Sequence, residues 1–264
     1  MKNETIGENK DTSTLYKPLI SIMGIVIIIL LWEGVVRITN MPSYILPAPS
    51  RVLIALIKSS PLIWSHTKIT LYESMTGFTV AFVFSFLLVF AMDNIPSVKE
   101  MIYPVLFISQ TVPIITVAPL FIVWFGYGLL PKIIIVALVC FFPIAVSLIG
   151  GLESTDKEMH DLLKCMGANR MQIFRTVKLP GALPSLFSGL KIAAAYSITG
   201  AVIGEWLGAK AGLGEFMRRS MHSFAVDRTF AAILVVSLLS LGIFRIITVL
   251  EKKLMPWTEL TEEI

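Results

Sequence analysis

The chain has 264 residues, of which 55% are apolar and only 15% charged, and its mean hydropathy is +0.80. This is more apolar surface than one soluble core normally buries, so lipid is the expected solvent. The net charge of +4 does not indicate nucleic-acid binding, because Lys and Arg lie in short connections between long apolar runs, as in the loops of membrane proteins.

The first apolar run, residues 18–38, follows a polar head that contains three lysines. The run is too long for a cleaved signal peptide and no small-residue cleavage site follows it, so we predict a retained first membrane helix. Residues 1–17 are expected to form a cytoplasmic polar segment. Residues 39–69 hold four prolines around a short amphipathic piece, Val52–Lys58, and are predicted to be a surface segment.

Six stretches are apolar and long enough to cross a hydrocarbon core of ~30 Å, which takes ~20 helical residues because every backbone polar group must be satisfied within the segment. These stretches are residues 18–38, 70–92, 101–125, 131–151, 187–207 and 229–250. The predicted fold class is therefore all-α, a polytopic membrane protein with about six transmembrane helices. Residues 18–250 are expected to form the transmembrane domain and residues 251–264 a cytoplasmic tail.

The third predicted span contains Pro113 and Pro119 beside several polar side chains. Proline removes a backbone donor and kinks a helix, so the freed carbonyl groups must face protein or a water-filled cavity. Two interpretations stay open: the polar groups line a translocation pathway, or they are satisfied in a packing kink between helices. The candidate pathway residues here are Gln110, Thr111, Pro113 and Thr116.

The connection between the fourth and fifth spans, residues 152–186, carries the most informative pattern. It is predicted to form a charged helix, a glycine turn, a second helix and a proline stop. Asp161, Leu162 and Leu163 precede Gly167, nine residues separate Gly167 from Val177, and Leu179 and Pro180 follow. A short charged helix that ends at a glycine offers apolar side chains and charges to another protein.

This loop resembles the EAA loop of ABC importer permeases, whose pattern is Glu-Ala-Ala, three residues, Gly, nine residues, an aliphatic residue, one residue and Leu-Pro. The spacing fits without a gap. The departures are an aspartate in place of Glu and two leucines in place of the alanines, which imply a modified docking surface or a pair of apolar anchors. The resemblance implies a coupling helix that lies in a groove of a separate ATPase. The coupling residues that it implies are Asp161, Leu162, Leu163, Gly167, Ala168, Arg170, Val177, Leu179 and Pro180.

Four further segments resemble the branch of these permeases that imports nitrate, taurine, alkanesulfonates and related small organic compounds. They are Leu46–Val52, the run TLYESMTGF beyond His66, Val112–Gly128 and Gly204–Met217. The resemblance implies the fold of the smaller ABC importer permeases and a homodimer that works with two cytoplasmic ATPases and an external solute-binding protein. It also implies cytoplasmic termini and leaves sulfonates, nitrate and heterocyclic vitamin precursors open as solutes.

The chain is not expected to be an enzyme. It has no Gly-x4-Gly-Lys-Ser/Thr run to hold ATP, so ATP and Mg²⁺ are expected in the partner ATPase and no cofactor in this chain. The three histidines, His66, His160 and His222, form no metal-ligand spacing, and Cys140 and Cys165 indicate neither a disulfide nor a metal site. An intramembrane enzyme would need a paired acid and base inside the spans, and none is recognised.

Glu205 is the isolated ionisable residue of most interest, because it lies at the end of the fifth span and such groups are costly in a membrane and often functional. Within the bilayer it would need a partner; otherwise it is an interfacial carboxylate beside Trp206. We include Glu205 among the candidate pathway residues, and Glu33 raises the same question. The alternative function is a structural or sensory membrane protein that uses residues 152–186 to bind a cytoplasmic partner.

Overall fold

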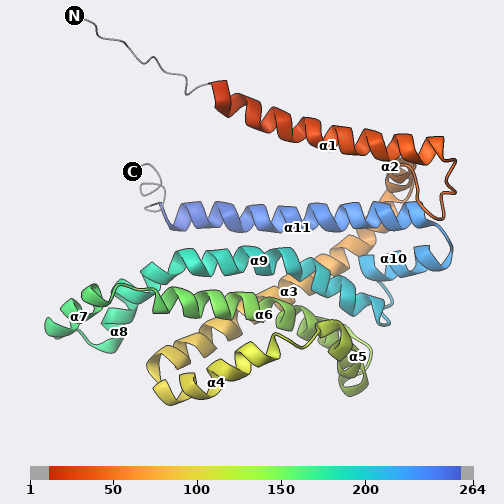
Figure 1. Cartoon of the computed structure of the whole chain (residues 1–264). Coiled ribbons are helices and arrows are strands. Elements are labelled where there is room, and N and C mark those ends of the chain that lie inside the picture. The colour runs from red at the N-terminus through yellow and green to blue at the C-terminus, as the bar shows by residue number, and fades with distance from the viewer. Residues whose placement is uncertain (1–11, 257–264) are drawn as a thin grey trace, which may run out of the picture. The chain divides into compact units, whose positions relative to one another are not determined.

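The computed structural model describes the backbone of residues 12–256 and the side chains of residues 22–256 (Figure 1). Its regular structure over these residues is entirely helical, which confirms the predicted all-α class. The predicted polar segment 1–17 and the tail 251–264 lie largely outside the described residues.

The helices follow one another with short connections. In chain order they are α1 (Thr12–Ile38), α2 (Pro49–Lys58), α3 (Ser60–Asn94), α4 (Pro96–Ser109), α5 (Ile114–Phe125), α6 (Leu129–Glu153), α7 (Lys157–Cys165), α8 (Arg170–Ile173), α9 (Leu179–Trp206), α10 (Leu213–His222) and α11 (Val226–Leu254). A π-helical turn, Phe174–Lys178, joins α8 to α9. The amphipathic piece predicted between the first two spans is confirmed as α2.

Two compact units make up the described chain. One lies within Met1–Ser60 and Ser220–Ala231, and the other within Pro61–Arg219 and Ala232–Ile264. The second unit contains the loop singled out by the sequence and most of the long apolar helices, so the candidate site is built within it.

In the first unit, Glu33 of α1 is anchored to the start of α2. Its carboxylate accepts hydrogen bonds from the Ser50 backbone N–H at 3.0 Å and the Ser50 Oγ at 2.8 Å. Arg37 Nε lies 2.6 Å from the same carboxylate. Because Ser50 is in the first turn of α2, Glu33 satisfies an amide that has no acceptor within its own helix. Glu33 therefore has the hydrogen-bond and ion-pair partners that an ionisable group near a membrane is expected to need.

Four of the predicted spans are confirmed as long apolar helices among the described residues. They are α3, α6, the continuous run Arg170–Trp206 that includes α9, and α11. The backbone of α1 covers the predicted first span, but part of its side chains lies outside the described residues.

The third predicted span, 101–125, is wrong as a single kinked helix. α4 and α5 are separate helices that meet at 104° across the break, so this segment is a broken span or a re-entrant loop. Pro113 has an extended backbone, with ψ of 117°, and stands directly before α5. Proline also disfavours the helical conformation of the residue before it, which favours an interruption of the helix at this position.

The structure also corrects two expectations about other prolines. α3 begins at Ser60, inside the stretch predicted as surface, because Pro61 in a first helical turn loses no hydrogen bond. Pro180 does not stop the helix that precedes it. The Leu179 N–H bonds to the Phe174 carbonyl in a π-helical turn, and this wider turn accommodates the proline so that the helix runs on into α9.

The core of the second unit is the contact between α6 and α9, which run side by side (Figure 1). Their backbones approach closely: a Cβ added at Gly189 would lie 2.6 Å from the Pro143 carbonyl oxygen. α3 packs onto α6 in a similar way, because a Cβ at Gly77 would lie 2.5 Å from the Val136 Cβ. Small residues at such contacts are typical of helix packing in membranes.

Candidate functional site

The predicted charged helix of the loop is α7, and none of its residues is buried. The Asp156 side chain caps its first turn by accepting the Glu158 N–H at 2.9 Å. Met159, Leu162 and Met166 are 48%, 56% and 74% exposed. Because residues three and four apart share one face of a helix, these three side chains form an exposed apolar stripe that runs along α7 to the residue after it.

Gly167 ends α7 with a φ of +85°, in the left-handed region expected from the sequence. The Gly167 N–H bonds to the Lys164 carbonyl and the Ala168 N–H to the Leu163 carbonyl, both at 3.0 Å. These paired bonds are a Schellman motif, which satisfies the last carbonyl groups of a helix. The direction of the chain after α7 is thus fixed by local hydrogen bonds.

α8 begins with a reciprocal cap. The Asn169 side chain accepts the Gln172 N–H at 2.9 Å, and the Gln172 side chain accepts the Asn169 N–H at 2.7 Å. This capping box satisfies two amides that the helix itself leaves unpaired. The turn between α7 and α8 therefore holds its shape without help from another protein.

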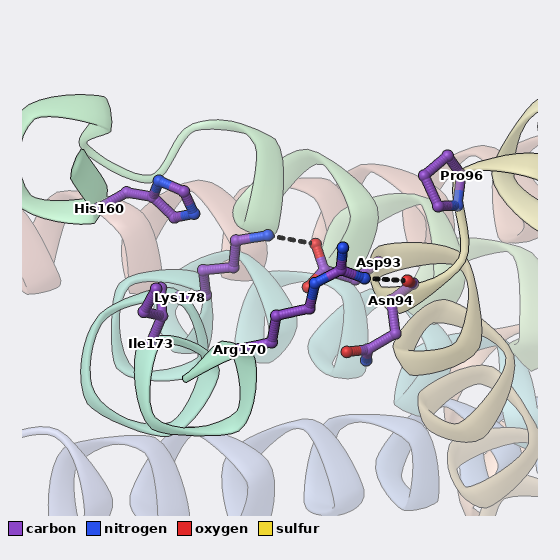
Figure 2. Close-up of a pocket in the computed structure, with 7 residues that line it drawn as sticks. All are labelled: Asp93, Asn94, Pro96, His160, Arg170, Ile173 and Lys178. Atoms are coloured by element: carbon purple, nitrogen blue, oxygen red, sulfur yellow. Dashed lines mark hydrogen bonds and ion pairs between the residues drawn. The ribbon is translucent and has the colours of Figure 1, made fainter. Parts of the chain in front are cut away.

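A cleft of about 250 Å³ lies between this loop and the connection from α3 to α4. Its lining residues are Asp93, Asn94, Pro96, His160, Arg170, Ile173 and Lys178 (Figure 2). Lys178 Nζ pairs with the Asp93 carboxylate at 2.7 Å, and Arg170 donates to the Asn94 carbonyl at 3.3 Å (Figure 2). The loop is therefore tied to the C-terminal end of α3 as well as to α6 and α9.

The residues implied by the loop pattern fall into two groups by exposure. Asp161, Leu162, Gly167 and Arg170 are exposed, whereas Leu163, Ala168, Val177, Leu179 and Pro180 are half-buried. The exposed group lies on α7 and the turn after it, and most of the half-buried group supports it from the run that leads into α9. Their coupling role stays a prediction.

The candidate pathway residues do not form one site. Gln110, Thr111, Pro113 and Thr116 surround the break between α4 and α5 and are all exposed in the single chain. The Thr111 and Thr116 hydroxyls donate to carbonyl groups three residues earlier, so they satisfy the interrupted backbone. Glu205 instead bonds to α3 and to the start of α10, and its assignment to the pathway stays a prediction.

Glu205 belongs to a buried polar centre, which we define as His66, Thr70, Glu73, Lys132 and Glu205. The Glu205 carboxylate accepts the Thr70 hydroxyl and the Gly214 N–H, both at 2.6 Å. Lys132 Nζ lies 2.6 Å from Glu73 Oε1. Glu205 is 0% exposed, so its carboxyl group is buried within the protein and has partners there. Its depth in the membrane stays a prediction.

The polar centre also holds the start of α10. The Gly212 N–H donates to His66 Nδ1 and the Leu213 N–H to the Thr70 hydroxyl, each at 2.8 Å. Together with the bond from Gly214, three successive amides at this helix terminus find acceptors in the polar centre. Gly212 has a φ of +123°, and a Cβ there would overlap the Glu205 carboxylate. Glycine is required at this position on both grounds.

Sequence reasoning found Glu205 but missed Thr70, Glu73 and Lys132. Two signals were available. Gly212 and Gly214 follow the glutamate by seven and nine residues, and glycines before a helix let backbone amides approach a carboxylate. Thr70 and Glu73 stand three residues apart, on one face of a predicted span, where polar residues are expected to have partners.

α10 itself was not predicted, and it is stabilised by ion pairs of its own. Glu215 is 1% exposed, and its carboxylate pairs with Arg218 at 2.7 Å and with Arg219 at 2.5 Å. Burial opposes ionisation of this carboxyl group, but the hydrogen bonds from the two arginines outweigh it. The pKa of Glu215 therefore lies below its ordinary value.

Comparison with known proteins adds independent information. Residues 88–256 match the family described as binding-protein-dependent transport system inner membrane component. The formylaminopyrimidine transport permease protein ThiX of Halalkalibacterium halodurans is 37% identical over 92% of this chain and 97% of its own length. The riboflavin transport system permease protein RibX of Chloroflexus aurantiacus is 34% identical over 88% of each chain. The taurine transport system permease protein TauC of Escherichia coli is 27% identical over 90% of this chain and 89% of its own.

Two solved structures share the fold. An amino acid ABC transporter crystallised with histidines aligns with a TM-score of 0.60 and 15% identity, over 76% of this chain and 97% of its own. The methionine ABC transporter MetNI, in an inward-facing conformation, aligns with a TM-score of 0.52 and 22% identity, over 72% of this chain and 94% of its own.

Proposed function

Because the chain belongs to the family of binding-protein-dependent transport system inner membrane components and is an ABC importer permease, we propose that a separate cytoplasmic ATPase docks on α7 and the turn after it. The observation that carries this proposal is the exposed apolar stripe of Met159, Leu162 and Met166 on a helix with no buried residue. An exposed apolar surface on an otherwise polar loop is typical of a protein interface. Leu162, which replaces a small residue of the family pattern, then acts as an apolar anchor.

The docked ATPase moves the membrane helices through the contacts around the cleft. A displacement of α7 reaches α3 through the Lys178–Asp93 ion pair and reaches α9 through the continuous helical run that follows Arg170. Uptake is therefore coupled to ATP hydrolysis in the partner, with no nucleotide bound by this chain.

Reconstitution in proteoliposomes with the ATPase and the solute-binding protein tests the proposal. ATP-dependent uptake and co-purification of the ATPase are expected for the wild type, and both should fall in Leu162→Asp. Lys68→Asp is a matched control, because Lys68 is an exposed residue of α3 far along the chain from the loop. A protein of the structural or sensory kind would show no ATP-dependent uptake.

The loop of residues 152–186 and both termini are proposed to be cytoplasmic. Cys165 in α7 is exposed and Cys140 in α6 is buried, so the native protein carries a reporter of orientation. An impermeant thiol reagent should label the protein in inverted vesicles and not in intact cells, and Cys165→Ser should abolish the labelling. Ready labelling in intact cells would contradict this orientation.

Two copies of the chain are proposed to form the pathway, with the break between α4 and α5 lining it. The support is the exposure of polar side chains at an interrupted helix, where freed backbone groups need water or protein. Gln110→Leu should lower uptake while the complex still assembles, and Thr79→Leu, an exposed change on α3, should not. Unchanged uptake in Gln110→Leu would favour the packing interpretation.

We propose that the solute is a small organic compound, and we favour the heterocyclic vitamin-precursor class over sulfonates. The relatives named for formylaminopyrimidine and riboflavin are 37% and 34% identical, whereas the relative named for taurine is 27% identical. Competition for uptake in the reconstituted system distinguishes the classes. Inhibition by taurine or an alkanesulfonate, with none by a pyrimidine or a flavin, would reverse the order.

A further inference from the structure

Two carboxyl groups of the polar centre are buried beside a single ammonium group. Glu73 is 1% exposed and Glu205 is 0% exposed. The side chain of Lys132 is 13% exposed, and its ammonium group pairs with Glu73. If both carboxyl groups were ionised, these three residues would carry a net charge of −1 away from water, which is strongly unfavourable.

One atom of this group has no hydrogen-bond partner. Glu73 Oε1 is bonded to Lys132, but Glu73 Oε2 is buried and unpaired among the described residues. Thr70, which donates to Glu205 at 2.6 Å, stands three residues before Glu73 on the same face of α3, so the two carboxyl groups interact. An ionised carboxylate has only acceptor atoms, so two of them in this position repel, whereas a protonated one donates a hydrogen bond to the other.

The hydrogen bonds to Glu205 decide which group carries the proton. Both of its oxygens already accept a donor, from the Thr70 hydroxyl and from the Gly214 N–H, and both bonds favour the ionised form. Glu73 Oε2, in contrast, accepts no hydrogen bond, so the proton is expected on this oxygen. A proton there satisfies the orphaned atom and makes the group of three residues neutral.

We propose that Glu73 and Glu205 form a buried proton-binding site, in which one proton on Glu73 Oε2 is donated to the Glu205 carboxylate and holds it against α3. The groups that face the site are His66 and Thr70 from α3 and Lys132 from α6, and Glu215 and Arg219 of α10 interact electrostatically with His66. His66 Nδ1 accepts the Gly212 N–H, so this nitrogen carries no proton. Because Glu205 accepts the Gly214 N–H near the start of α10, loss of the shared proton weakens the hold on that helix. The proposal does not depend on the ATPase or on the solute.

The site is tested by infrared spectroscopy of the full chain in lipid nanodiscs at neutral pH. A protonated carboxyl group has a carbonyl stretch that is separate from those of carboxylates and peptide groups. The wild type should show one such band, and labelling of glutamate with a heavier carboxyl carbon should move it. Absence of the band in the wild type, or failure of the label to move it, would overturn the proposal.

Two single variants show whether the proton is shared. In Glu73→Gln or in Glu205→Gln the amide NH₂ supplies the donor that the proton supplied, so the remaining carboxyl group ionises and the band should be lost in both. Glu100→Gln, an exposed change in α4, should leave it in place. Persistence of the band in either single variant would assign the proton to one carboxyl group alone and reject the shared site.

A second measurement covers the case in which a variant does not fold. The folded wild type holds a proton that the unfolded chain releases at neutral pH, so its thermal stability should fall as the pH rises above neutral. Lys132→Arg keeps the positive charge and should show the same fall. A stability of the wild type that does not depend on pH in this range would contradict the proposal without any variant of Glu73 or Glu205.

Discussion

Polar and apolar side chains are placed in opposite ways at the two ends of the second unit. At the end that holds α7, apolar side chains are exposed and the charged groups Asp161 and Arg170 stand at the surface. At the end that holds Glu205, charged groups are buried and almost every polar atom has a partner. The first end has a shape fixed by local bonds and a surface left free, which suits a partner that binds repeatedly. The second end is part of the folded core, so changes there act on stability first.

The largest effect that would sharpen this comparison is expected from Glu205→Ala. The change leaves the Gly214 N–H without its acceptor and opens a cavity, which together should lower the free energy of unfolding by about 2–4 kcal/mol. Thermal unfolding of the purified protein in nanodiscs measures it. Glu205→Gln keeps an acceptor oxygen and the volume, so its loss should be clearly smaller. Equal losses in the two variants would show that the hydrogen bonds do not matter.

Gly167→Val is expected to have the next largest effect, at the other end. A β-branched residue at a φ of +85° costs about 1–3 kcal/mol, and the chain avoids this by changing the turn between α7 and α8. Membrane insertion and thermal stability should be nearly normal, while ATPase binding and solute-stimulated ATP hydrolysis should be lost. Gly167→Asn is the matched control, because asparagine tolerates the left-handed region. Full uptake by the valine variant would remove the coupling role of the loop.

Glu215→Gln tests the polar end outside the long spans and should have a smaller effect. The pKa of this carboxyl group is lowered in the folded protein, so its ion pairs stabilise fully above the unfolded pKa of about 4.3 and are lost as the pH falls through the lower folded value. The wild type should be about 1 kcal/mol more stable than the variant at pH 7, discounted because both arginines are partly exposed. Unfolding midpoints measured from neutral to acidic pH should converge. A difference between the two unfolding midpoints that stays constant over this pH range would contradict the ion-pair explanation.

The smallest effect is expected from Asp161→Lys. If this change destabilised the fold, the contrast between the two ends of the second unit would not hold. Asp161 is exposed and its contact is His160 at 3.2 Å in the same helix, so the unfolding midpoint should not move. ATPase binding should weaken by a few-fold at most, since exposed ion pairs contribute only ~0.2–1 kcal/mol. Binding titrations of the ATPase and thermal unfolding on the same samples separate the two effects.

Most of the fold could be predicted from the sequence, because it depends on local and additive properties. The length and hydropathy of runs such as 131–151 determine a membrane helix whatever their neighbours are. The turn at Gly167 was also predictable, since its hydrogen bonds link residues no more than five apart. The 104° break was not, because proline allows either a kink or an interruption, and the packing of α5 on α6 decides between them.

The polar centre was beyond sequence reasoning for a different reason. Thr70 and Glu205 are 135 residues apart, and no local pattern says which polar residues of α3, α6 and α9 meet. α10 was missed because its two arginines and its buried glutamate resemble a solvated loop, although the glutamate is 1% exposed in the structure. Pairing across long separations is therefore the information that the sequence alone did not supply.

The close backbone contact between α6 and α9 has a geometric consequence for transport. Helices that touch at Gly189 and Pro143 without side chains between them have little freedom to slide or bend independently, so they behave as one stiff body. α9 has 28 residues, which gives a rod of ~42 Å, and a tilt of ~5° about one end displaces the other by ~4 Å. Such a small rotation leaves the packing of the loop intact. At the far end of α9, where Glu205 holds the start of α10, it produces a movement about as wide as a water molecule.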